Sequence, residues 1–269
     1  MVAAVKGHVD VCELLLEAGS DVGEKNNNGV KPLFGAAYFG HADVCELLLE
    51  RGKANIEETD SDGNTALYLA ASKGHASTVA LLLSKGARVD TKIKDGFTPL
   101  LLAVQKGHTE VCERLLEASS GVEERNPITM FTNLHFAAIN GHERIIKLLL
   151  THKAVVNSRE KIEATPLHLA SQEGHLASVV ALLQAAADPL MPRIDGALPI
   201  HKAAQENHCE VVRILIESTK CSPDQVRYVS TMQCINHHSN VFLACRGCPT
   251  KSNLIVSSCS QTPRMEEPH

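Results

Sequence analysis

Blocks of apolar residues separated by short polar segments recur along most of the chain. In the clearest blocks the apolar side chains are spaced i, i+3 and i+4, as in Val44–Leu49, Ile145–Leu150 and Val211–Ile216. This spacing places them on one face of a helix. The pattern therefore predicts a series of short amphipathic helices, each with one buried face.

A second kind of apolar block precedes several of these helices, in the ranges Thr65–Ala71, Thr98–Val104, Thr165–Ser171 and Leu198–Ala204. Three of the four have proline as their second residue. Proline suits the first turn of a helix, because its missing N–H would have no partner there. Polar segments with glycine, such as Asp60–Gly63, lie before the blocks, and glycine supplies the positive φ of tight turns. The sequence thus predicts pairs of helices joined by turns.

A dipeptide between the two helices recurs with a fixed period. It stands at Gly7-His8, Gly40-His41, Gly74-His75, Gly107-His108, Gly141-His142 and Gly174-His175, and then as Asn207-His208. The numbers of successive histidines differ by 33, 34, 33, 34, 33 and 33. Such a constant period is the signature of a repeat protein, in which each unit buries its apolar face against its neighbours.

A helix, a Gly-His turn, a second helix and a polar loop, with the block Thr165-Pro-Leu-His168, resemble the ankyrin-repeat family. The resemblance covers residues 1 to about 218 and implies an all-α solenoid of helix-turn-helix units with protruding β-hairpin loops. Residues 1–218 are thus predicted to form one repeat domain, with a truncated first repeat and six more. Residues 219–269 are predicted to form an irregular, disordered tail that contains Cys and Ser.

Several positions depart from the family pattern. The first unit begins at Met1 inside its own first helix, so the chain has the look of a piece of something longer. Gly35 stands where the family places Leu, at a helix-propensity cost of roughly 1 kcal/mol. Met130 and Glu163 replace the turn glycine of the fifth and sixth units. We expect these two hairpins to be distorted.

Composition narrows the function classes. The net charge of −5, the pI near 6.3 and the lack of a basic run argue against nucleic acid as a partner. No apolar stretch approaches the roughly 20 residues of a membrane-spanning helix, and the first residues lack a signal-peptide layout. Nine cysteines, an odd number, indicate a reducing interior. Cytoplasm, with the nucleus as an alternative, is the expected compartment.

Cysteine and histidine offer the main candidate chemistry. His and Cys form i, i+4 pairs such as His41 and Cys45, but other repeats carry Val or Ile in the cysteine position. Because Val and Ile can replace Cys at this position, we interpret the cysteine as a packing residue and not as a nucleophile. We therefore expect free thiols at Cys12, Cys45, Cys112 and Cys209 to pack as small hydrophobes. No catalytic motif has a supporting context, so neither an enzyme nor a cofactor is predicted. The tail offers one alternative, a zinc set of Cys234, His237, Cys245 and Cys248.

The resemblance also implies where a partner binds. Ankyrin proteins use a concave groove lined by hairpin tips and by the two residues before Gly-His. Transferred to this chain, the predicted partner-binding residues are Tyr38, Phe39, Lys73, Phe97, Lys106, Phe131, Ile139, Asn140, Glu173 and Glu206. Lysines at Lys6, Lys73 and Lys106 give way to glutamates at Glu173 and Glu206, which would orient a partner with one acidic and one basic end. The aromatic side chains suit binding hot spots, and the alternative is that their rings pack on neighbouring hairpins. The family further implies that Asn157 can be hydroxylated.

These observations predict a non-catalytic interaction module, an adaptor or scaffold that binds a protein of unknown identity. It is expected to be a monomer or part of a larger assembly, without nucleic-acid or membrane partners. The alternative is a substrate-recognition subunit, or a fragment of a larger enzyme complex or multidomain protein such as a ligase adaptor. The same scaffold serves unrelated functions, so the repeat pattern leaves the partner open.

Overall fold

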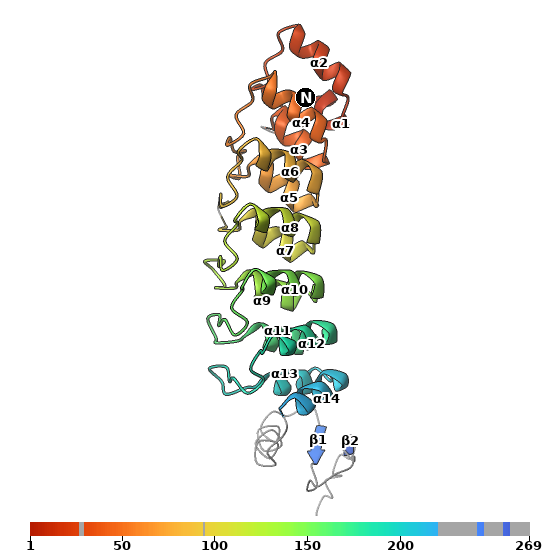
Figure 1. Ribbon diagram of the computed structural model, residues 1–269, viewed down its shortest axis with the longest axis vertical. Helices are drawn as coiled ribbons and strands as arrows, with labels where there is room; N and C mark the ends of the chain where they lie inside the picture. The colour runs from red at the N-terminus through yellow and green to blue at the C-terminus, as the bar shows by residue number, and fades with distance from the viewer. Residues whose placement is uncertain (27–29, 94, 220–240, 245–254, 259–269) are drawn as a thin grey trace, which may run out of the picture.

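The computed structural model describes residues 1–26, 30–93, 95–219, 241–244 and 255–258. Helix pairs stack into an elongated solenoid in chain order, with the loops along one side (Figure 1). The first helices of the seven repeats are α1 (Val2–Lys6), α3 (Pro32–Phe39), α5 (Ala66–Lys73), α7 (Pro99–Lys106), α9 (Asn133–Ile139), α11 (Pro166–Gln172) and α13 (Pro199–Gln205). The second helices are α2 (Val9–Glu17), α4 (Ala42–Glu50), α6 (Ala76–Ser84), α8 (Thr109–Glu117), α10 (Glu143–Thr151), α12 (Leu176–Gln184) and α14 (Cys209–Ser218). The predicted all-α solenoid of helix-turn-helix units is confirmed.

The first helices begin and end as the sequence predicts. Thr65 and Thr98 cap α5 and α7 by accepting a hydrogen bond from the backbone N–H of the residue three positions on. Proline occupies the first turn of α3, α7, α11 and α13. Glycine ends α5 and α7 in the left-handed conformation, and its N–H closes the helix. Helices of only seven or eight residues are marginal alone, so neighbouring repeats must hold them.

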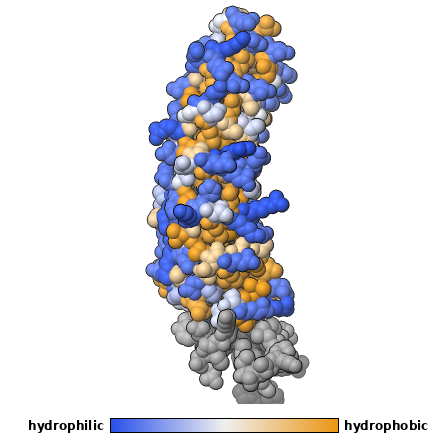
Figure 2. Space-filling view, viewed as in Figure 1, coloured by the Kyte–Doolittle hydropathy of each residue, from blue (hydrophilic) through white to orange (hydrophobic). Residues whose placement is uncertain are grey.

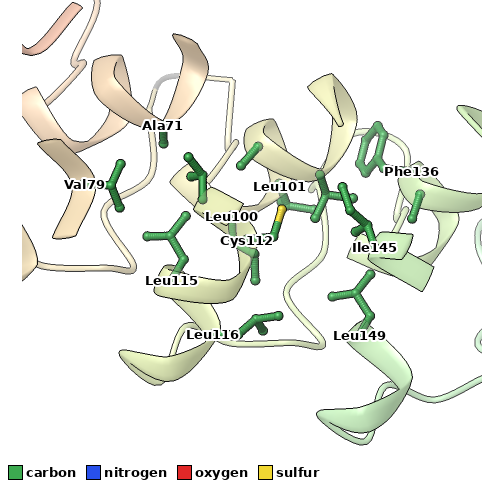
Figure 3. Packing of buried hydrophobic residues seen from close by; sticks show 14 of the residues in the cluster. Ala71, Val79, Leu100, Leu101, Cys112, Leu115, Leu116, Phe136, Ile145 and Leu149 are labelled. Carbon is green, nitrogen blue, oxygen red and sulfur yellow. The ribbon is translucent and has the colours of Figure 1, made fainter. Parts of the chain in front are cut away.

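Small aliphatic side chains fill the junctions between repeats. First helices pack on first helices and second helices on second helices, so the core runs the length of the stack. Leu100, Leu115, Ile145 and Leu149 are almost fully buried and come from consecutive repeats (Figure 3). Cys112 lies in the same layer with no exposed surface. Each repeat therefore depends on the next for burial, as in other solenoids.

The Gly-His turn joins each repeat to the one before it. The histidine ring packs on the preceding repeat's glycine so closely that a Cβ there would lie 2.4 to 2.7 Å from a ring atom. Its Nε2 donates a hydrogen bond to a carbonyl of that repeat, in the pairs His41–Val5, His75–Tyr38, His108–Ser72, His142–Gln105, His175–Ile139 and His208–Gln172, at 2.9 to 3.3 Å. From His41 onward, the histidines that recur at a constant period in the sequence therefore each form the same contact between two consecutive repeats.

A second set of histidines connects the loops to the first helices. The Nδ1 atoms of His135 and His168 accept the backbone N–H of Thr132 and Thr165. Their Nε2 atoms donate to the carbonyls of Ala164 and Ala197 in the following repeat, each at 3.1 Å. Each ring thus makes a local hydrogen bond within its own repeat and also joins that repeat to the next.

The fifth and sixth hairpins were both expected to be distorted, and for the sixth this is wrong. Glu163 adopts φ 60°, and Glu160 N–H bonds to the Ala164 carbonyl, as Asp60 does to Asn64 in the third repeat. Met130 is also left-handed, at φ 63°, but the fifth hairpin is one residue longer and closes from Asn126 to Phe131. Backbone bonds and packing therefore hold non-glycine residues in a conformation that costs of the order of 1 kcal/mol.

Regular strands are scarce in the part of the chain that the structure describes. The hairpin loops contain one isolated antiparallel bridge, Arg125 with Thr132. Two four-residue strands, β1 (Val241–Ala244) and β2 (Ile255–Ser258), pair antiparallel within the region predicted to be irregular. Among the described helices, none has the length and apolarity needed to cross a membrane.

Thr78 offers a test of the core. Its side chain is fully buried where other repeats carry Val44 or Val111, and its hydroxyl has no partner among the described residues. Replacing Thr78 by valine should raise the free energy of unfolding by about 1 kcal/mol, because the unpaired hydroxyl is removed. The same change at the exposed Thr151, whose hydroxyl donates to the Leu148 carbonyl, should give no gain in urea denaturation. Equal effects at both sites would contradict this reading of the core.

Candidate functional site

The two residues before each Gly-His or Asn-His turn form two columns along the first helices. The first slot column contains Val5, Tyr38, Ser72, Gln105, Ile139, Gln172 and Gln205, and the second contains Lys6, Phe39, Lys73, Lys106, Asn140, Glu173 and Glu206. The turn histidines bond to the carbonyls of six first-column residues, which fixes the slots of adjacent repeats in register. Side chains in these columns are thus positioned by the stack without being needed for its core.

Tyr38 and Phe39 form an exposed aromatic pair at the end of α3. Their rings lie 5.0 Å apart in a T-shaped arrangement, and 37% of Tyr38 and 52% of Phe39 is exposed. The Lys73 ammonium of the next repeat lies 4.4 Å from the centroid of the Tyr38 ring. Three of the predicted residues therefore meet at one place and are accessible from outside.

Phe97 and Phe131 are placed differently. Both are half-buried, and both pack against Phe136 of α9, with ring centroids 5.6 and 5.4 Å apart. Phe131 also stacks on His135 at 5.4 Å. These rings thus help to join the fourth and fifth repeats, and only their remaining surface is open to a partner. The sequence did not predict a role for Phe136. It occupies a position that holds Leu169 in the next repeat, and nothing in the sequence indicated that it would form an aromatic cluster.

The other predicted slot residues lie on the surface in the same register. Lys106, Asn140, Glu173 and Glu206 are exposed, whereas Ile139 is half-buried. Asn140 Nδ2 donates a hydrogen bond of 2.8 Å to the Phe136 carbonyl at the end of α9. Figure 2 shows apolar residues interspersed with hydrophilic ones along the whole stack. Their role in partner binding stays a prediction.

The buried cysteines of the helical repeats are poor nucleophiles. Cys12, Cys45 and Cys112 are buried free thiols, which confirms their predicted packing role. Burial raises the pKa of Cys45 and of Cys112 to about 12, so the thiolate is strongly disfavoured. The expectation for Cys209 is wrong, because this thiol is exposed. It is the first residue of α14, directly after the turn, whereas the buried thiols stand four positions after it.

Two further predictions concern a metal and a modification. The zinc set Cys234, His237, Cys245 and Cys248 lies outside the described residues. Within the described ones, no group of three or more His, Cys, Asp or Glu side chains could hold a metal ion. Asn157 is half-buried, and its Oδ1 accepts a hydrogen bond of 3.0 Å from the Asp188 N–H of the next loop. Its hydroxylation stays a prediction.

Comparison with known proteins places these features in a family. The model for ankyrin repeats (3 copies) matches residues 1–93, 54–128, 89–160 and 134–227. The crystal structure of the human ASB11 ankyrin repeat domain is similar, with 27% identity, a TM-score of 0.72, and coverage of 80% of this chain and 95% of that chain. The ankyrin repeat domain of Bcl-3, a member of the IkappaB protein family, matches at 26% identity and a TM-score of 0.68, covering 80% and 96%. A search of curated proteins gives no match.

Proposed function

This chain belongs to the ankyrin-repeat family, and from that premise we propose that it is a non-catalytic adaptor that binds a partner protein across its two slot columns. Ankyrin repeat domains are generally protein–protein interaction modules. The buried cysteines with raised pKa support a role without catalysis. A reducing compartment, the cytoplasm or the nucleus, suits a chain whose helical repeats contain four free cysteines.

The exposed pair Tyr38 and Phe39 carries the proposal. The chain has only nine aromatic residues, three Tyr and six Phe. Two of them project from neighbouring slots, although the equivalent slots hold Ser72, Lys73 or Gln105 without harm to the stack. Tyr is among the residues most enriched in binding hot spots, and both Tyr and Phe are enriched in interfaces. A surface of this kind, held rigid by the stack, suits a binding site better than a packing site.

A variant with Tyr38→Ala and Phe39→Ala tests the proposal. Capture from a reducing cell lysate should recover specific proteins with the wild-type chain and lose them with the variant. Loss of a hot-spot pair costs 2 kcal/mol or more, which weakens binding by about 30-fold. The variant should keep the melting temperature of the wild type within a few degrees, because both side chains lie largely outside the core.

A matched control removes exposed apolar side chains from second helices. Leu14 of α2 is 65% exposed and Leu176 of α12 is 38% exposed. The variant with Leu14→Ala and Leu176→Ala should retain the captured proteins. If the aromatic variant keeps the same proteins as this control, the slot columns are not the binding surface and the proposal fails.

A further inference from the structure

Charge is distributed unequally along the second slot column. Lys6, Lys73 and Lys106 lie in the first, third and fourth repeats, and Phe39 stands between the first two lysines. Glu173 and Glu206 hold the same slot in the last two repeats. All are exposed. The N-terminal half of this column therefore attracts acidic groups, and the C-terminal half repels them.

None of these three lysines lies in an ion pair of the described stack. Several cations on the second helices and loops lie in ion pairs, such as Lys85 with Glu46 at 3.0 Å and Lys92 with Glu124 at 2.7 Å. Among the described residues, no carboxylate lies within ion-pair distance of Lys6, Lys73 or Lys106. Their charges are thus free to meet a partner.

An apolar contact lies beside the free charges. Lys73 extends over the Tyr38 ring, with its Nζ 4.4 Å from the centroid, and Phe39 packs edge-on against Tyr38. A partner residue with an apolar side chain could rest on the two rings while an acidic neighbour reaches the ammonium.

The distance between consecutive repeats matches the rise of a partner helix over seven residues. Packed helices lie about 8 to 10 Å apart, so the slot column offers one side chain at about that interval. A partner helix rises 1.5 Å for each residue, and its seventh residue returns to nearly the same face after about 10.5 Å. A helix lying along the columns can therefore present one side chain to each repeat.

We propose that the N-terminal half of the slot columns binds an amphipathic helix of the partner protein with acidic side chains at heptad spacing. Two acidic residues seven positions apart face Lys73 and Lys106, and an apolar residue one heptad before them rests on Tyr38 and Phe39. A further acidic residue, one heptad earlier, faces Lys6. This inference rests on the proposed function and adds the chemistry of the partner.

The probe is a synthetic helical peptide of 25 residues, with Glu at its positions 1, 15 and 22 and Leu at position 8. Its binding to the full chain is measured by fluorescence anisotropy. A second peptide of the same composition places its Glu residues on the opposite face. The first should bind the full chain at least about tenfold more tightly than the second. Equal affinities of the two peptides would overturn the inference.

Charge reversal gives the matched protein variants. Lys73→Glu with Lys106→Glu should weaken binding of the probe by at least about tenfold, and a probe with Lys in place of Glu should recover it. Lys153→Glu with Lys161→Glu, two exposed lysines outside the slots, makes the same change in net charge and should leave binding unaltered. Equal loss in both variants would show a general charge effect and would also overturn the inference.

The lysate experiment separates this inference from the proposed function. If captured proteins are lost with Tyr38→Ala and Phe39→Ala but fully retained with Lys73→Glu and Lys106→Glu, the slot columns bind a partner that is not an acidic helix. The proposed function then stands and the inference fails. Retention with both variants refutes the two together, and loss with both supports them.

Discussion

Replacing Gly107 by alanine should lower the free energy of unfolding by about 3 kcal/mol, a large effect for the addition of one methyl group. Gly107 has φ 80°, where a side chain costs about 1 to 2 kcal/mol. Its new Cβ would also lie 2.7 Å from the His142 ring. The ring must move, which weakens its hydrogen bond to the Gln105 carbonyl and the packing between the fourth and fifth repeats.

Gly86 separates these two causes. It has φ 88°, but a Cβ added there would meet no atom within 4 Å. Gly86→Ala should therefore cost only the conformational part, about 1 to 2 kcal/mol. Urea denaturation of both variants at pH 7 makes the comparison. Equal losses would show that the glycine is required by the backbone alone and that the histidine contact contributes nothing.

Acidification from pH 7 to pH 5 should lower the stability by about 4 kcal/mol through two histidines. Burial lowers the pKa of His135 and of His168 to about 4, from 6.5 for the ordinary side chain. In the unfolded chain these groups take up protons below about pH 6.5, whereas in the folded chain they stay neutral until about pH 4. Their contribution is fully present above pH 6.5 and is lost progressively as the pH falls towards 4.

A single substitution checks this assignment. His168→Gln should be less stable at pH 7 and should lose about half of the decrease between pH 7 and pH 5, measured as the urea midpoint. The exposed His152, replaced by glutamine, should leave the pH dependence unchanged. The account is wrong if His168→Gln keeps the full decrease of the wild type.

The stack could be predicted from the sequence because each repeat carries its own local signals. Pro166 in the first turn, Gly174 after the helix and the apolar spacing of α12 act within a few residues. The contacts between repeats could not be predicted from local sequence signals, because a hydrogen bond such as that from His175 to the Ile139 carbonyl joins residues 36 positions apart. Asn207 occupies the turn position that glycine holds in the other repeats. It is left-handed at φ 62°, and as the last turn of the described stack it has no following histidine packed on it.

The candidate site was predicted in outline only. The columns followed from the period, but the sequence could not show that Phe97 and Phe131 pack against Phe136 while Tyr38 and Phe39 stay exposed. That outcome depends on which rings of adjacent repeats meet. The longer fifth hairpin had no specific signal in the sequence, because the step from His108 to His142 is 34 residues, but so is the step from His41 to His75, whose hairpin from Asp60 to Asn64 has the usual length.

Site-specific photo-crosslinking tests the central claim most directly. A photoreactive phenylalanine analogue would replace Phe39 in the second slot column or Arg144, an exposed residue of the second helix α10. In reducing lysate, irradiation should join the chain to a specific partner protein from position 39 and not from position 144. Crosslinking from position 144 alone, or equally from both, would contradict a binding surface on the slot columns.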